Sequence, residues 1–156
     1  MNIGEMCNRE VIVIEKSGSI VEAAKLMRQY HVGDLVVIEK RQNGAYPLGI
    51  ITDRDIVIEL VAGEVNFEAV TVGDVMSGEL LTAREEDEVA ETIKRMRGAG
   101  VRRVPVVNQR GRLEGVITMD DMIDLLAELL EDLVALVGTQ SRRERRKCVP
   151  VGGEPT

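Results

Sequence analysis

Two short segments of the chain place a threonine directly after an apolar run and an aspartate three residues later. The segments are GIITDRD and GVITMDD. A threonine hydroxyl can bind a phosphate or a sugar, and an aspartate carboxylate can accept two hydrogen bonds from a vicinal diol such as that of ribose. Thr52 with Asp55, and Thr118 with Asp121, are therefore candidate nucleotide-binding pairs.

The same pattern is also typical of a helix start that binds nothing. Threonine is a favoured N-cap residue, and an acidic side chain three positions later can accept a hydrogen bond from the N-cap N–H group. A negative charge there also complements the helix dipole. In this interpretation Thr52 and Thr118 are N-caps, and Asp55 and Asp121 complete two capping boxes. Both interpretations place each pair where a strand meets a helix.

The two junctions belong to a longer internal repeat. Met27 and Met96 are 69 residues apart, the two junctions are 66 apart, and Met6 and Met76 are 70 apart. The spacing changes near the start of the second copy and in a loop that is shorter there. Constant spacing within elements, with gaps at turns, indicates a structural duplication.

The first copy shows the order strand, helix, strand, strand, helix. An apolar run at 11–14 precedes a helix that starts near Ser19. The dipeptide Asn43-Gly44 favours a hairpin between LVVIE and LGII, and the second helix should end near Gly63.

The second copy repeats this order, with an apolar run at 80–82 and helical spacing of Val89, Ile93 and Met96. We therefore expect an α+β fold in which two β-α-β-β-α units pack pseudo-symmetrically around a shared core. The expected boundaries are 1–70 for the first unit, 71–137 for the second and 138–156 for a basic, disordered tail.

The ordered set of motifs resembles the cystathionine-β-synthase (CBS) domain family. The motifs are GVRRVPVV followed by GVITMDD, GIITDRD followed by IVIELV, and TVGDVM at the start of the second copy. The resemblance covers residues 1–137 and implies a tandem CBS pair, also called a Bateman module. It further implies that the Thr and Asp of each junction contact the phosphate or ribose of adenosine nucleotides, and that Val13, Ile14 and Thr82 contact the base.

Three arginines are the candidate phosphate ligands, because a guanidinium binds phosphate oxygens bidentately. They are Arg54 within TDRD, and Arg102 and Arg103 before VPVV. A solvated charged surface is the alternative interpretation. In the repeat alignment an acid, Asp34, stands where the second copy has Arg103. We therefore expect two unequal clefts.

Composition restricts the function classes further. The net charge is −7, aromatic residues make up 2%, and Arg142 to Lys147 carry five positive charges and one negative. An acidic body with few aromatics argues against a broad nucleic-acid surface. Two distant cysteines, Cys7 and Cys148, are typical of reduced thiols in the cytosol. Neither a signal peptide nor a membrane span is recognisable, so we expect a cytoplasmic protein.

The region 119–137 has the pattern of a long amphipathic helix whose apolar stripe is wider than one domain needs. We expect part of it to contact a second subunit, and the resemblance also implies a homodimer.

Two functional hypotheses follow. The first is a stand-alone regulatory module, not an enzyme, that binds AMP, ADP, ATP or S-adenosylmethionine between the two units, requires no cofactor and signals to a regulated protein. The alternative is a non-catalytic dimeric interaction module without nucleotide, whose basic tail contacts a partner or nucleic acid.

Overall fold

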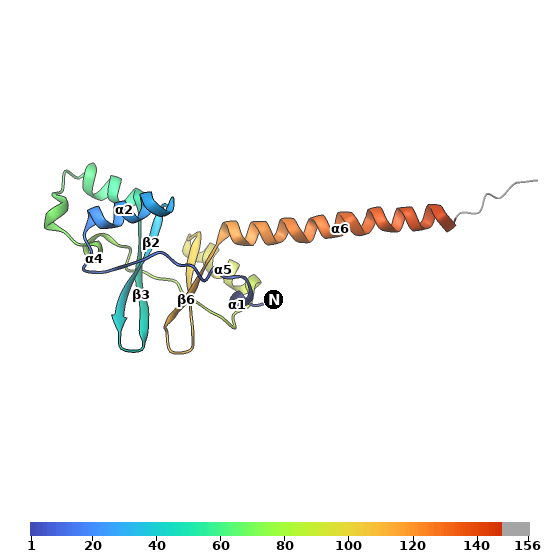
Figure 1. The fold of residues 1–156 in the computed structure, drawn as a ribbon, viewed down its shortest axis with the longest axis horizontal. Helices are drawn as coiled ribbons and strands as arrows, with labels where there is room; N and C mark the ends of the chain where they lie inside the picture. Colours follow the sequence, from blue (N-terminus) through green and yellow to red (C-terminus); the bar gives the residue numbers. More distant parts are fainter. Residues whose placement is uncertain (148–156) are drawn as a thin grey trace, which may run out of the picture. The chain divides into compact units, whose positions relative to one another are not determined.

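The computed structural model describes residues 1–147 (Figure 1). It divides into two units, Met1–Met119 and a second that starts at Asp120 and contains most of the last helix. Cys148 and the end of the expected tail lie outside the described residues. Within the described part of the chain, each helix is too short or too polar to cross a membrane.

The elements of the first copy follow the expected order. They are α1 (Ile3–Met6), β1 (Val13–Glu15), α2 (Ile20–Tyr30), β2 (Asp34–Arg41), β3 (Gly44–Thr52), α3 (Asp53–Asp55), the π-helix η1 (Ile56–Val61) and the 3₁₀ turn η2 (Phe67–Ala69). Helix α2 begins as predicted, because the Ser19 side chain accepts a hydrogen bond from the N–H group of Glu22. Residues 53–61 form one helical segment of nine residues that changes from α to π geometry.

The second copy repeats the order. Its elements are α4 (Val72–Val75), β4 (Ala83–Arg84), α5 (Val89–Ala99), β5 (Arg103–Val107), β6 (Leu113–Thr118) and α6 (Met119–Lys147). The first strand of each copy starts later than the apolar run predicts. In the second copy, Leu80 and Leu81 precede β4 instead of lying within it.

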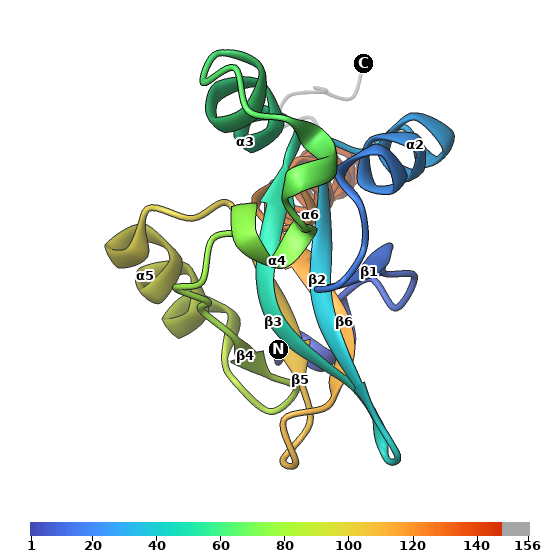
Figure 2. The same ribbon diagram turned by 90° about the vertical axis from the view of Figure 1, so that its left-hand side faces the viewer.

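Each copy forms a three-stranded sheet of its own. β1 runs parallel to β2 and β2 antiparallel to β3, and β4, β5 and β6 repeat this arrangement. The predicted hairpin turn at Asn43-Gly44 joins β2 to β3, with Arg41 paired to Gly44. The two hairpins point the same way and their turns are neighbours, as Figure 2 shows. The α+β class and the two repeated units are therefore confirmed.

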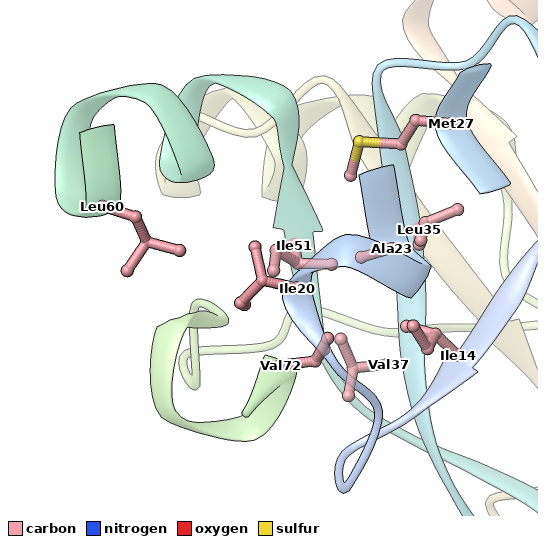
Figure 3. Close-up of a cluster of buried hydrophobic side chains, with 9 residues drawn as sticks. All are labelled: Ile14, Ile20, Ala23, Met27, Leu35, Val37, Ile51, Leu60 and Val72. Atoms are coloured by element: carbon pink, nitrogen blue, oxygen red, sulfur yellow. The ribbon is translucent and has the colours of Figure 1, made fainter. Parts of the chain in front are cut away.

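The core of the first copy is aliphatic, as the scarcity of aromatic residues predicts. Side chains from β1, α2, β2, β3 and η1 meet in one cluster (Figure 3). Val72 joins this cluster from α4, the helix that opens the second copy. Its counterpart Ile3, in α1, is also fully buried. The opening helix of each copy therefore contributes a buried apolar side chain.

The opening helices are exchanged between the copies. Two backbone N–H groups of each helix donate to the loop after the first strand of the other copy. The bonds are Ile3 to Asp87, Gly4 to Glu85, Val72 to Gly18 and Gly73 to Lys16, with N–O distances of 2.8–2.9 Å. Because α1 and α4 are 69 residues apart, Met6 corresponds to Val75, and the predicted match of Met6 with Met76 is one residue out of register.

After each opening helix, the chain crosses closely over the last strand of the other copy. The Ser77 N–H group donates to the Ile50 carbonyl at 3.0 Å, and Asn8 and Val116 exchange two backbone hydrogen bonds of 2.9 Å. A Cβ atom at Gly49 would lie 2.3 Å from the Ser77 carbonyl oxygen. A Cβ atom at Gly115 would lie 2.8 Å from the Cys7 sulfur. The glycine that opens each junction motif therefore permits the crossing.

The segment after η1 differs from the predicted glycine cap. Glu64 adopts the left-handed conformation, with a φ angle of 53°, whereas Gly63 does not. The N–H group of Val65 donates to the Leu60 carbonyl and closes the turn at 2.9 Å. The helix therefore ends where expected, but the left-handed residue is Glu64.

The C-terminal ends of α2 and α5 use different residues in the same left-handed conformation. His31 ends α2 with φ of 53°, and its counterpart Gly100 ends α5 with φ of 67°. A non-glycine residue there costs about 1 kcal/mol, because its Cβ crowds the following carbonyl. Replacing His31 with glycine should therefore raise the free energy of unfolding by about 1 kcal/mol.

Urea denaturation of His31→Gly measures this directly. The reciprocal variant Gly100→Ala should lose a similar amount. A His31→Gly protein less stable than the parent would show that the histidine side chain makes a stabilising contact that outweighs the strain.

Helix α6 continues well past the expected end of the second unit. Residues 138–147, which the sequence predicts as a disordered tail, are helical. Arginine, glutamine and glutamate are good helix formers, and positive charge near the C-terminus complements the helix dipole. These local preferences explain why the helix continues where apolar periodicity stops.

Candidate functional site

A cleft of about 530 Å³ lies between the two copies, within residues 1–119. The first copy contributes Thr52 and Asp55 from the strand-to-helix junction, together with Arg54. The second copy contributes Arg102 and Arg103 from the start of β5. Five of the ten predicted site residues therefore line one cavity, whose volume suits a small-molecule ligand.

The junction in the cleft is a complete capping box. The Thr52 hydroxyl oxygen accepts from the Asp55 N–H group at 3.0 Å, and Asp55 Oδ2 accepts from the Thr52 N–H group at 2.9 Å. Both side chains are half-buried. A carboxylate has about four lone-pair positions and a hydroxyl also carries a donor hydrogen. The cap therefore leaves both groups with capacity to bind a ligand.

Two equivalent positions of the repeat form an ion pair in this cleft. Asp34 starts β2 and Arg103 starts β5, and a carboxylate oxygen of Asp34 contacts a guanidinium nitrogen of Arg103. The Asp34 side chain is only 10% exposed, and that of Arg103 is 38% exposed. At this repeat position the first copy has an acid and the second copy has a base, and the structure brings the two side chains into contact. Asp34 therefore balances part of the positive charge that Arg103 supplies.

The charge of the cleft is nearly balanced. Three arginines line it, and so do four acids: Asp34, Asp53, Asp55 and Glu79. The formal charge of the lining is therefore −1. Arg54 and Arg102 are both exposed. The cleft is thus a mixed-charge site and not a strongly basic phosphate pocket.

The apolar side of the cleft comes from Ile50, Leu80, Leu81 and Val101. The predicted base-contacting residues lie elsewhere. Val13 and Ile14 line a hollow beside α2, and Thr82 lines a separate hollow beside β5. Sequence reasoning missed Leu80 and Leu81 because it assigned them to a strand. They reach the cleft because they follow the segment that crosses the first copy at Ser77, a contact between the copies that no local sequence pattern indicates.

The second junction is divided between two elements. Thr118 ends β6, and Asp121 lies in the first turn of α6. Both residues take part in interactions within the structure. Binding by Thr118 and Asp121 remains a prediction.

Comparison with known proteins identifies the family to which the chain belongs. The family model for the CBS domain matches the chain twice, over residues 3–62 and 72–128. The chain belongs to the CBS domain family. Its two repeats form a CBS domain pair, and the cleft lies between the two CBS domains. The family match ends 19 residues before the described end of α6.

Two relatives illustrate the similarity. The uncharacterized protein MK0525 of Methanopyrus kandleri is 36% identical over 125 residues, which cover 80% of this chain and 62% of that protein. The chain thus matches less than two thirds of that relative's length. The CBS domain pair of protein MJ0100, solved with 5′-methylthioadenosine and S-adenosyl-L-methionine, is 25% identical with a TM-score of 0.70. That comparison covers 82% of this chain and 97% of the MJ0100 chain.

Proposed function

We propose that this CBS pair is a non-catalytic regulatory module that binds an adenosine-containing ligand between its two domains. The observation that carries the proposal is the cleft itself. It joins Thr52 and Asp55 of one domain to Leu80, Leu81 and Arg102 of the other. The related pair of MJ0100 binds two adenosine derivatives, which supports the same ligand class here.

The lining suggests one orientation of the ligand. Asp55 would accept hydrogen bonds from the ribose diol, as acidic residues do in dinucleotide sites. Leu80 and Leu81 would cover the adenine, because bases are flat and largely apolar on their faces. Arg54 and Arg102 would lie near the group carried on the 5′ carbon. The ribose would then contact the first domain, the adenine the second, and the 5′ group both.

The charge balance narrows the ligand class. A lining with formal charge −1 opposes the accumulation of several negative charges in one cleft. Adenosine derivatives without a polyphosphate, such as S-adenosylmethionine and 5′-methylthioadenosine, fit this balance better than ADP or ATP. AMP is intermediate, since Arg54 and Arg102 can offset a single phosphate.

A ligand that bridges the two domains can act as a signal. If the two domains can adopt two arrangements, the ligand favours the arrangement that it binds more tightly, and the shift is limited by the difference between its two affinities. A regulated protein would then recognise the favoured arrangement.

A thermal-shift panel tests the binding proposal. The panel contains S-adenosylmethionine, 5′-methylthioadenosine, AMP, ADP and ATP, each with ligand-free protein. A ligand at 100 times its dissociation constant adds about 2.7 kcal/mol of stability. For a chain of this size the melting temperature should rise by about 5–10 °C. A panel in which none of the compounds raises the melting temperature would contradict the proposal.

The variant Asp55→Asn separates binding from capping. Asparagine retains a side-chain oxygen for the cap but loses the charge that favours a diol. We expect the affinity for the best ligand to fall about tenfold, with less than about 1 kcal/mol change in ligand-free stability. The matched control is Asp74→Asn, because Asp74 caps α4 in the same way and is absent from the cleft lining. Equal effects of both variants on affinity would overturn the ribose role.

The competing function is an interaction module without nucleotide. The Thr52–Asp55 capping box favours it, because the pair already has a structural role. In that case no compound of the panel shifts the melting temperature. The basic residues near the end of α6 would then contact an acidic partner or nucleic acid, and this contact would weaken steeply with salt.

We also propose that the protein is a homodimer. Eight apolar side chains of α6 are between 46% and 72% exposed in the single chain. Such a continuous apolar surface is typical of an interface. Multi-angle light scattering of the purified protein measures the mass directly.

A further inference from the structure

Most of the exposed apolar residues of α6 form a single seam. The helix has 29 residues and is therefore about 43 Å long. Seven of its eight exposed apolar residues follow a seven-residue repeat, with Leu126 and Leu133 at the first position and Leu129 and Leu136 at the fourth. The fifth position holds Ile123, Leu130 and Val137. We call these seven residues the α6 seam.

The pattern of the seam is that of a helix-pairing surface. Apolar residues at the first and fourth positions of a heptad, widened by a third position, are typical of helices that pack along their length. The seam runs from Ile123 to Val137, and the CBS family match ends within it, at residue 128. The repeated domains therefore do not account for its second half.

The charges of α6 indicate which way a partner helix runs. Residues 119–133 contain six acids and no basic residue, whereas residues 134–147 contain five basic residues and one acid. A parallel copy would place acids beside acids and arginines beside arginines. An antiparallel copy directs the basic end of each helix toward the acidic start of the other, and Arg142 lies level with the partner's Asp120 when Leu126 is level with the partner's Leu136.

We propose that the α6 helices of two copies pair antiparallel through the α6 seam. This inference rests on the proposed homodimer and names its interface, but it does not depend on ligand binding. In an antiparallel pair, a first-position residue packs level with a fourth-position residue of the partner. Leu126 then lies level with the partner's Leu136, and Leu129 with the partner's Leu133. The polar Gln140 lies level with the partner's Met122 and ends the seam.

Disulfide trapping in the full chain tests the orientation. Both native cysteines are first removed as Cys7→Ser and Cys148→Ser, and an unchanged melting temperature confirms the fold. Leu126→Cys and Leu136→Cys are then made separately, one of them with a size tag. Antiparallel pairing predicts that mild oxidation of the mixture gives mainly the mixed disulfide. Each variant oxidised alone should give at least tenfold less dimer.

A matched control uses Asp124→Cys with Gly138→Cys. These positions are level in the same antiparallel register but lie on the polar side of the helix, so they should cross-link poorly. Efficient cross-linking of Leu126→Cys with itself would show a parallel pair and overturn the proposal. A dimer in which neither combination cross-links would show a different interface.

Light scattering of Leu129→Glu provides the second measurement. Leu129 is 46% exposed in the single chain, so the monomer should stay folded while the dimer dissociation constant rises at least 100-fold. A monomeric parent protein would also overturn the proposal. The cross-linking and light-scattering experiments use protein without an adenosine ligand. A negative result in them is therefore distinguishable from a negative result in the ligand panel.

Discussion

Replacing Gly49 with alanine should destabilise the protein by about 3 kcal/mol. The added Cβ would lie 2.3 Å from the Ser77 carbonyl oxygen and 2.8 Å from the Met76 sulfur. A backbone oxygen cannot rotate away as a side chain can. The chain crossing must therefore move, and the 3.0 Å hydrogen bond from Ser77 to Ile50 is lost. The melting temperature should fall by about 6–12 °C.

The matched control for this prediction is Gly78→Ala. Gly78 is one residue beyond the crossing, and a Cβ atom there meets nothing within 4 Å. Its free energy of unfolding should change by less than about 0.5 kcal/mol. Equal stability of the two variants would show that the crossing adjusts without cost. Gly115→Ala should be intermediate, since the backbone oxygen that its Cβ would meet, that of Asn8, lies 2.9 Å away instead of 2.3 Å, and the Cys7 sulfur at 2.8 Å belongs to a side chain.

Substituting Asp34 and substituting Arg103, each in a separate variant, should change the affinity for AMP in opposite directions. Asp34→Asn removes one negative charge and changes the formal charge of the cleft lining from −1 to 0. AMP should then bind about tenfold more tightly, because Arg103 can turn toward the phosphate. Arg103→Ala changes the lining to −2 and should weaken AMP about tenfold. Titration calorimetry at one fixed salt concentration measures both affinities.

A remote charge change controls for long-range effects. Glu59 is exposed on η1 and is absent from the cleft lining, so Glu59→Gln removes the same charge without altering the site. Its effect on AMP affinity should be less than about twofold, because salt screens distant surface charges. A Glu59→Gln protein that matches Asp34→Asn would attribute the gain to net charge alone. An unchanged or weakened affinity in Asp34→Asn would contradict the role of the ion pair.

Much of the fold was predictable because the chain repeats its own pattern. The β-α-β-β-α order follows from apolar periodicity and from turn residues such as Asn43-Gly44, and each is a local signal. Comparing the copies also showed that Asp34 and Arg103 occupy equivalent positions. Their contact was not predictable, because it depends on how the two copies face one another.

The exchange of α1 and α4 could not be predicted from periodicity. Each helix has four residues, which is too short for an apolar stripe, and each is positioned by hydrogen bonds to the distant copy. The cleft was predicted only in part, because some of its lining residues are placed by contacts between the copies. Thr52 and Asp55 carry a local capping signal, whereas Leu80 and Leu81 reach the cleft only because the exchanged segment ends beside them.

The exchanged helices also have a consequence for how such a protein can arise. A chain with only one repeat would keep its opening helix but could not seat it on itself, because the helix belongs on a neighbour. Two such chains would complete one another, so a single repeat is suited to self-association. Joining the two repeats in one gene makes that encounter intramolecular and replaces a dependence on protein concentration with a fixed effective concentration. After that fusion the two halves can diverge, as Asp34 and Arg103 have, without losing their partner.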